Sequence, residues 1–576
     1  MKPSLIPLLL LSAATPLAAQ ESHTFPTAND GQSRVEITSI FSPPPPTGFV
    51  PLRIAVTNST EADQSVRIDT SSESNSGSSA ISSFSINAPR RETTVTELMA
   101  PAFSPPVTSG YDQSSFNIDS SAAGSTNSFR MVSSGLGDLP CVAFSTALVG
   151  KNLDDINNGA SSSGPSSWHY QNRAFASSYE PAQLPSDWRG LSGIDVLVMT
   201  TDDWRDLDPA RQLAVRHWIA LGGQLELRSA APSTDLNSLG LALDGGAQPD
   251  GDARRGLGSV RLTPWNGIAL GSDTFRAYAA GNDRPTPERV RHNSGVTVTS
   301  LLETIGPRAA SALPVGLILL AFGILVGPLN LFKFAGPTRR HRLFITTPLI
   351  SLGASLVLLG FILARDGTGG RGRRSAVIYI NPDDHAACIR QEQICRTGVL
   401  LGSSFSTSQP AAVSVGAVSA FDSSNPSLSF SNSTSNSNLR CAFNSPTDLS
   451  GDWFQSRSEQ VHFIKTVTAT RGRIEISGTP DAPSAVSSFD FPLDSLFWRD
   501  AADQWWQAPS TVTTGTPTLL AKVPAIDLST FIVARAVSPK GRWFLATTSD
   551  PRAGLVDTLP SIRWERNDII LCGPVP

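Results

Sequence analysis

Four aspartates crowd a short segment that follows an apolar run in the first half of the chain. The run covers residues 196–199, and the acids are Asp202, Asp203, Asp206 and Asp208. Open α/β sheets bind ligands beyond the carboxyl ends of their parallel strands, and clustered oxygen atoms suit Ca²⁺ or Mg²⁺. These carboxylates are therefore the first candidate for a ligand or ion site. The simpler interpretation is helix capping, because free N–H groups and the helix dipole attract acids to helix N-termini.

The neighbouring residues predict the elements that would position these acids. The uninterrupted apolar run 196–199 is typical of a parallel strand covered on both faces. Asp208 suits an N-cap and Pro209 the first turn of a helix. Gly222 and Gly223 end that helix, and residues 224–227 return as a strand. The pattern predicts a βαβ unit with an acidic loop, inside an α/β domain that covers residues 131–275.

The segment 195–227 resembles the glutamine amidotransferase-like, flavodoxin-like domains, above all those of bacterial membrane proteins and of auxiliary proteins of ABC transporters. The chemistry of that family needs a cysteine on a strand-to-helix elbow, with a histidine–acid pair beside it. Here the strand end reads LELRSAAPS, and Ser229 is its nearest hydroxyl. The resemblance therefore implies the fold without the reaction, and we assign no catalytic residue. The alternative is a hydrolase site around Asp202, Asp203 and Ser229.

Targeting and membrane segments are predicted at three places. Residues 1–19 have the basic start, short apolar core and small-residue exit of a signal peptide. Residues 309–332 and 343–364 carry no charge and are each long enough for a bilayer core of about 30 Å. The loop 333–342 between them holds Lys333, Arg339, Arg340 and Arg342, and short basic loops stay in the cytoplasm. We expect a transmembrane hairpin in a bacterial inner membrane, with the large domains in the periplasm.

The hairpin also carries a motif. Residues 326–330 read VGPLN, in which Gly327 and Pro328 can kink a helix and Asn330 can bond across the hairpin or to another membrane subunit. Together with GFVPLRIAVTN and GDWFQSR elsewhere, this motif resembles an uncharacterised family of bacterial inner-membrane proteins. That family combines an outer β domain, an amidotransferase-like domain, a membrane hairpin and a further β domain, and it implies no catalytic residues.

The five cysteines of an exported chain suggest an oxidising compartment. Cys388 and Cys395 are close enough in sequence for a local disulfide, and Cys441 with Cys572 could form a second one. A zinc site of His385, Cys388 and Cys395 is the alternative, although a fourth ligand is not evident.

Two further regions are predicted to be β-rich. Apolar residues alternate with polar ones in 50–56, which predicts a small immunoglobulin-like β-sandwich over residues 30–130. Residues 276–308 form a linker to the hairpin, and residues 375–576 form a β-rich periplasmic domain. Tryptophans of that last domain could make a glycan-binding face or could pack in its core: Trp453, Trp498, Trp505, Trp506, Trp543 and Trp564.

These features favour a multidomain membrane protein that binds other proteins. The net charge of −4 gives no basic field for nucleic acid. No cofactor or metal is expected. We interpret the chain as a non-catalytic interaction or scaffold protein of an envelope complex, of the kind that accompanies ABC-type transporters. The alternatives are the periplasmic hydrolase and the glycan-binding module.

Overall fold

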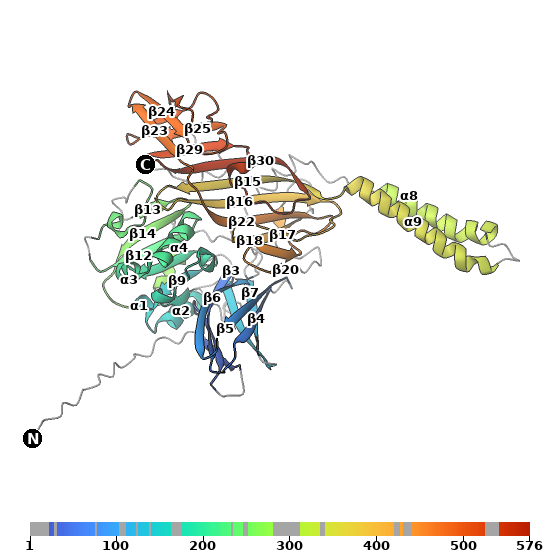
Figure 1. Ribbon diagram of the computed structural model, residues 1–576, viewed down its shortest axis with the longest axis horizontal. Coiled ribbons are helices and arrows are strands. Elements are labelled where there is room, and N and C mark those ends of the chain that lie inside the picture. Colours follow the sequence, from blue (N-terminus) through green and yellow to red (C-terminus); the bar gives the residue numbers. More distant parts are fainter. Residues whose placement is uncertain are drawn as a thin grey trace, which may run out of the picture.

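The computed structural model describes residues 22–27, 32–74, 78–102, 111–122, 125–136, 140–162, 176–231, 234–245, 252–279, 312–334, 340–419, 427–429, 439–524 and 541–575. The predicted signal peptide, Arg339 and most of the predicted linker 276–308 lie outside these ranges. The described chain is mostly β structure in several sheets, and two apolar helices project from the body (Figure 1).

The N-terminal part is a sandwich of two sheets. Its first sheet has the order β1 (Ser22–Pro26), β2 (Arg34–Ser39), β3 (Gly48–Asn58), β6 (Glu92–Ala102). Its second sheet contains β5 (Ser79–Ala88), β4 (Gln64–Ser74), β7 (Tyr111–Ala122) and β8 (Ser125–Leu136). Alternate residues such as Val50, Leu52, Ile54 and Val56 meet Val66 and Ile68 in one core. The predicted alternation is confirmed, but the predicted domain boundary at residue 131 falls inside β8.

The second sheet of the sandwich continues into strands from the far end of the chain. β20 (Arg440–Phe443) pairs with β5 in parallel, and β21 (Asp448–Gly451) and β17 (Phe405–Ser406) follow it. The sandwich therefore shares a sheet with the C-terminal part.

The middle part is an α/β domain. Its described strands lie in the order β10 (Ala176–Tyr179), β9 (Val142–Ser145), β11 (Val196–Thr200), β12 (Gln224–Ser229), β14 (Gly258–Pro264), β13 (Asp252–Arg255). All but β13 run parallel, which gives the order of a doubly wound sheet. Val196 and Val198 face one core while Leu197 and Met199 face another, which explains the uninterrupted apolar run. Its helices are α1 (Thr146–Val149), α2 (Leu153–Ser162), α3 (Thr201–Asp206), α4 (Pro209–Ala220), α5 (Thr274–Ala279), η1 (Pro181–Gln183), η2 (Trp188–Leu191) and η3 (Leu236–Leu239).

The predicted βαβ unit is confirmed, with one correction. Asp208 caps α4, Pro209 opens it, and β12 pairs in parallel with β11. The segment expected to be an acidic loop is the helix α3, which a capping box between Thr200 and Asp203 begins. Asp202, Asp203 and Asp208 lie at helix starts, as the simpler interpretation held, whereas Asp206 ends α3.

Ten described strands of the C-terminal part form one large sheet. Its order is β19 (Ser427–Ser429), β18 (Ala411–Ser419), β22 (Glu459–Ala469), β16 (Ala386–Thr397), β15 (Gly370–Asn381), β30 (Ile562–Pro574), β29 (Trp543–Thr548), β25 (Ser495–Arg499), β26 (Trp505–Gln507), β28 (Ala521–Val523). A small sheet of β23 (Ile474–Thr479), β24 (Ala482–Ser487) and β27 (Thr518–Leu519) and the turn η8 (Pro551–Ala553) accompany it. Ile378 and Ile380 of β15 pack in the core of the C-terminal part, whereas Val377 and Tyr379 face the α/β domain.

Buried polar groups fasten the α/β domain to this sheet. The hydroxyl of Tyr379 donates to the carboxylate of Asp244 over 2.6 Å, and the amide of Gly256 donates to the same carboxylate over 2.7 Å. Arg255, with no exposed surface, donates to the carbonyls of Arg216, Leu241 and Ala242 and pairs with Asp384 in the turn between β15 and β16. Burial raises the pKa of Asp244 to about 6, against the opposing effect of these hydrogen bonds and of Arg255.

The two projecting helices are long and apolar enough to cross a membrane. α8 (Ala312–Ile324) continues as the π-helix η4 (Leu325–Phe334), and η5 (Arg340–Arg342) precedes α9 (Leu343–Asp366). The windows Gly316–Lys333 and Leu343–Arg365 have mean hydropathies of 1.8 and 2.1, and almost none of their surface is covered. The π turns begin just before Pro328, whose ring does not fit the carbonyl four residues back in an α-helix.

Asn330 joins the two helices of the hairpin, as predicted. Its side-chain amide donates to the hydroxyl of Thr347 over 2.9 Å and its carbonyl accepts from Thr346 over 2.7 Å. Asn330 has no exposed surface. Lys333, Arg340 and Arg342 lie at the tip of the hairpin, at the end remote from the body of the protein.

Replacing Arg255 should loosen the α/β domain from the large sheet. Arg255→Met removes the guanidinium bonds to three carbonyls and one of the two arginines that pair with Asp384, at a cost of about 3–5 kcal/mol. Arg254→Met, an exposed neighbour on β13, should change the unfolding free energy by less than about 0.5 kcal/mol. Thermal unfolding of the detergent-solubilised protein measures both changes, and equal melting temperatures for the two variants would contradict this role for Arg255.

Candidate binding cleft

The acids predicted as a ligand or ion site have separate local structural roles. Asp203 accepts the amide of Thr200 over 3.0 Å, and Asp202 pairs with Arg205 over 2.9 Å. Asp208 accepts the amides of Ala210 and Arg211, each over 3.0 Å, and the bond from the Arg211 amide lowers its pKa. Across the described residues, no group of three or more His, Cys, Asp and Glu side chains could hold a metal ion.

Ser229 and the acids lie at the same sheet edge, and His217, in the same domain, lies at the opposite one. β12 ends at Ser229 beside the end of β11, where Asp202 and Asp203 follow. The Ser229 hydroxyl is 5% exposed and bonds to Ala231 and Thr234 within its own loop. His217 lies in the last turn of α4, which leads back to the start of β12 and so to the opposite edge. Burial lowers its pKa to about 4, so it is neutral there at physiological pH.

The predicted disulfide between Cys388 and Cys395 is wrong. Both cysteines are free and lie on the single extended strand β16, seven residues apart. At about 3.3 Å per residue their Cα atoms are about 23 Å apart, far beyond the ~7 Å limit of a disulfide. Burial raises the pKa of each thiol to about 12, which makes both inert. Cys441 and Cys572, the other pair considered, are also free and buried.

The zinc alternative fails for the same reason, since Cys388 and Cys395 cannot reach one ion. His385 instead borders a cavity of about 550 Å³ together with Asn381, Arg471 and Arg473. Two guanidinium groups beside an imidazole repel a divalent cation.

The tryptophans of the C-terminal domain belong mainly to its interior. Trp453 and Trp543 are 1% exposed, and Trp498, Trp505 and Trp506 are 6–8% exposed. The half-buried Trp564 lies under the guanidinium of Arg374, 5.1 Å from its ring centroid. Of the six, five are core residues, and so they offer no aromatic face to a glycan.

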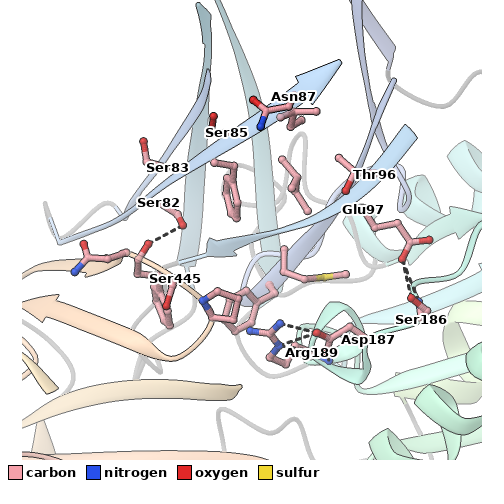
Figure 2. A pocket seen from close by; sticks show the side chains of 18 of the residues that line it. Ser82, Ser83, Ser85, Asn87, Thr96, Glu97, Ser186, Asp187, Arg189 and Ser445 are labelled. Atoms are coloured by element: carbon pink, nitrogen blue, oxygen red, sulfur yellow. Dashed lines mark hydrogen bonds and ion pairs between the residues drawn. The ribbon is translucent and has the colours of Figure 1, made fainter. Parts of the chain in front are cut away.

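A second concave site lies where the three parts meet. We call it the junction cleft: a cavity of about 590 Å³ between β5 and β6 of the sandwich, closed by η2 of the α/β domain and by the turn after β20. Figure 2 shows Ser82, Ser83, Ser85 and Asn87 along one wall and Thr96, Glu97, Asp187, Arg189 and Ser445 around the others.

Aromatic side chains from distant segments make one end of the junction cleft. The ring of Phe49 packs edge-on against Phe443, with centroids 5.4 Å apart, and Phe443 packs in the same way on Trp453. The guanidinium of Arg189 lies over Phe49, 5.6 Å from the centroid. Phe84, Leu98 and Met99 add apolar surface. Such mixed clefts at domain junctions are typical binding sites.

The charged groups of the junction cleft are already paired with one another. Arg189 and Asp187 form an ion pair of 2.6 Å, and Glu97 accepts two hydrogen bonds of 3.2 Å from Ser186. The remaining polar lining is neutral, mostly hydroxyls. The surface of the cleft is therefore largely neutral, since its three charged side chains already have partners.

Sequence reasoning did not find this cleft. Its walls come from residues 82–99, 186–189 and 443–446, and only the pairing of β20 with β5 brings the third segment to the first. None of these residues belongs to a motif that a search for chemistry would select.

No protein-family model matches the chain, and no curated protein matches it. Among solved structures, it is similar to a yeast delta-COP-I mu-homology domain complexed with a Dsl1 WxWxV peptide, with 12% identity over 36% of this chain and 95% of that chain and a TM-score of 0.16. It is also similar to a beta-glucuronidase from glycoside hydrolase family 2, with 8% identity over 97% of this chain and 62% of that chain and a TM-score of 0.20. A Paenibacillus cycloisomaltooligosaccharide glucanotransferase complexed with cycloisomaltoheptaose shares 10% identity over 34% of this chain and 27% of that chain, with a TM-score of 0.17. At these TM-scores the likenesses assign no function.

Mutation can distinguish the role of the acids in helix capping from a role in ion binding. Asp208→Ala removes the N-cap of α4 and should lower the unfolding free energy by about 1 kcal/mol. Asp206→Ala, an exposed acid of the same group that caps no helix, should change it by less than about 0.5 kcal/mol. Thermal unfolding with and without millimolar CaCl₂ or MgCl₂ makes the comparison. If either salt raises the melting temperature of the wild type but not that of Asp206→Ala, the interpretation of these acids as an ion site would be supported after all.

Proposed function

We propose that this chain is a membrane-anchored, non-enzymatic interaction protein of a bacterial envelope complex, and that the junction cleft binds a segment of its protein partner. The observation that carries the proposal is the cleft itself. Three parts of the chain contribute walls to it, its lining combines aromatic and hydroxyl groups, and its charges are internally paired. Neutral, partly aromatic surfaces of this kind are common at the centre of protein interfaces.

The hydrolase and glycan-binding alternatives receive less support. Ser229 is engaged in its own loop, Asp203 and Asp208 cap helices, and His217 lies at the other edge of the sheet. The aromatic residues expected to bind sugars are mostly core residues. A binding role, unlike a hydrolase, requires no catalytic group in the cleft.

The placement in the cell is part of the proposal. We place the hairpin in the inner membrane and the body in the periplasm, since an exported N-terminus followed by two spans returns the chain to the periplasm. The basic residues Lys333, Arg340 and Arg342 lie at the tip of the hairpin, away from the body, which supports a cytoplasmic loop. The doubly wound strand order supports a flavodoxin-like, amidotransferase-like domain, and the two-sheet sandwich supports an immunoglobulin-like one. An ABC-type transporter is the class of complex that the resemblance implies.

A photo-crosslinking residue in the cleft should capture the partner in native membranes. With benzoylphenylalanine at Thr96 in the full chain, we expect one discrete adduct, because Thr96 lines the cleft. The matched control carries the same group at Leu519, which is 67% exposed on β27, outside the cleft. Thr94→Arg, which places a long charged side chain in the neutral lining, should abolish the adduct from Thr96. No adduct, or the same adduct from Leu519, would overturn the proposal.

A further inference from the structure

We propose that the partner segment binds the junction cleft as an added β-strand on the free edge of β5. This inference rests on the proposed function and names how the partner is recognised. The added strand is an extended, uncharged stretch of a protein of different sequence, with apolar residues at alternate positions. It occupies the space in line with β20, past the point where β20 turns away.

The edge of β5 is only half covered. β20 pairs with residues 79–82 and ends at Phe443, whereas β4 pairs with β5 along residues 79–88. The amide of Ser79 donates to the carbonyl of Leu439, so the Ser79 backbone groups face β20. Backbone directions alternate along a strand, and the register of β5 with β4 is regular. The N–H and C=O groups of Ser83, Ser85 and Asn87 therefore face away from β4, toward the cleft.

These three residues leave the backbone hydrogen-bond ladder incomplete on the side of β5 that faces away from β4. Within the described ranges, no backbone group pairs with Ser83, Ser85 or Asn87 on that side. The free stretch 83–87 spans about 17 Å, at about 3.4 Å per residue, which is the length of an ordinary strand. Exposed edges of this kind are templates for strand addition, a recurring mode of peptide recognition.

The cavity lies in the place that a next strand would occupy. β5 and β6 follow one another in the chain, but they belong to opposite sheets of the sandwich. The two strands meet at the turn of residues 89–91, and the space between their edges widens with distance from that turn. Both edges and the turn after Phe443 line the junction cleft. β20 already adds a strand to this edge of β5 within the chain, and the cleft continues the line of β20 along the same edge.

The lining sets the chemistry of the added strand. Its inward side chains would meet Phe84 and Leu98 at the sandwich core, which calls for apolar residues at every second position. Its outward side chains would lie beside the exposed Ser83, Ser85 and Asn87. Glu97, Asp187 and Arg189 already have partners, so a charge on the segment would lose its water without gaining a counter-ion.

A proline at Ser85 tests the mode of binding. Ser85→Pro removes the free N–H and places the ring against an incoming strand, while it leaves the ladder with β4 intact. Ser85→Ala keeps the N–H and removes only the exposed hydroxyl contact with Ser65. The readout is the yield of the Thr96 photo-adduct in native membranes, with the full chain. We expect about a tenfold loss for Ser85→Pro and no more than about a twofold change for Ser85→Ala.

The outcomes separate this inference from the proposed function. An undiminished adduct in a folded Ser85→Pro variant would overturn strand addition and leave the binding role of the cleft standing. An adduct with the mass of two copies of this chain would also overturn it. If Ser85→Pro lowers the melting temperature, Asn87→Pro tests the same edge nearer its end, with Asn87→Ala as its control.

Discussion

The parallel pairing of β20 with β5 is the constraint on which the shape of the body depends. Four residues of the C-terminal part join a sheet of the N-terminal sandwich, and the hydroxyl of Ser82 donates to the carbonyl of Phe443 across 361 positions of the chain. The aromatic contact between Phe49 and Phe443 fills the same junction. Because the pairing stops after four residues, it joins the sandwich to the C-terminal part and leaves the rest of the β5 edge without a strand neighbour among the described residues. The junction cleft is thus a consequence of how the parts are joined.

The large sheet connects this junction to the two apolar helices and to the α/β domain. α9 leads through residues 367–369 directly into β15, so the hairpin and the sheet are nearly continuous. Tyr379 of the same strand bonds to Asp244 of the α/β domain, and Arg255 bonds to the turn that follows. Such contacts, buried away from water, are specific in geometry and costly to break singly. These contacts join the α/β domain to the same strand that follows the apolar hairpin.

Local signals carried the successful predictions. An N-cap aspartate, a proline in the first turn and a glycine pair define α4 without help from tertiary structure, and two long apolar runs define the hairpin in which Asn330 bonds across. The predictions that failed were those about which residues lie close together in space. The spacing of Cys388 and Cys395 suggests proximity only if the chain turns between them, and it runs straight. Two of the four aspartates that looked like a ligand set, Asp203 and Asp208, cap helices, because two successive helices begin in this segment. The cleft needs a parallel pairing between strands more than 350 residues apart, which no periodicity encodes.

Hydrogen exchange along β5 tests the central claim most directly, because one strand contains both the covered and the open edge. In the full chain without partner, the amides of Ser79 and Ile81, which face β20, should be protected. Those of Ser83, Ser85 and Asn87 should exchange much faster, and the even-numbered amides that face β4 should be protected throughout. Addition of the captured partner should slow exchange at the three open positions. Uniform protection of residues 79–88 in the free protein would contradict the account, because it would mean that the edge of β5 is already closed.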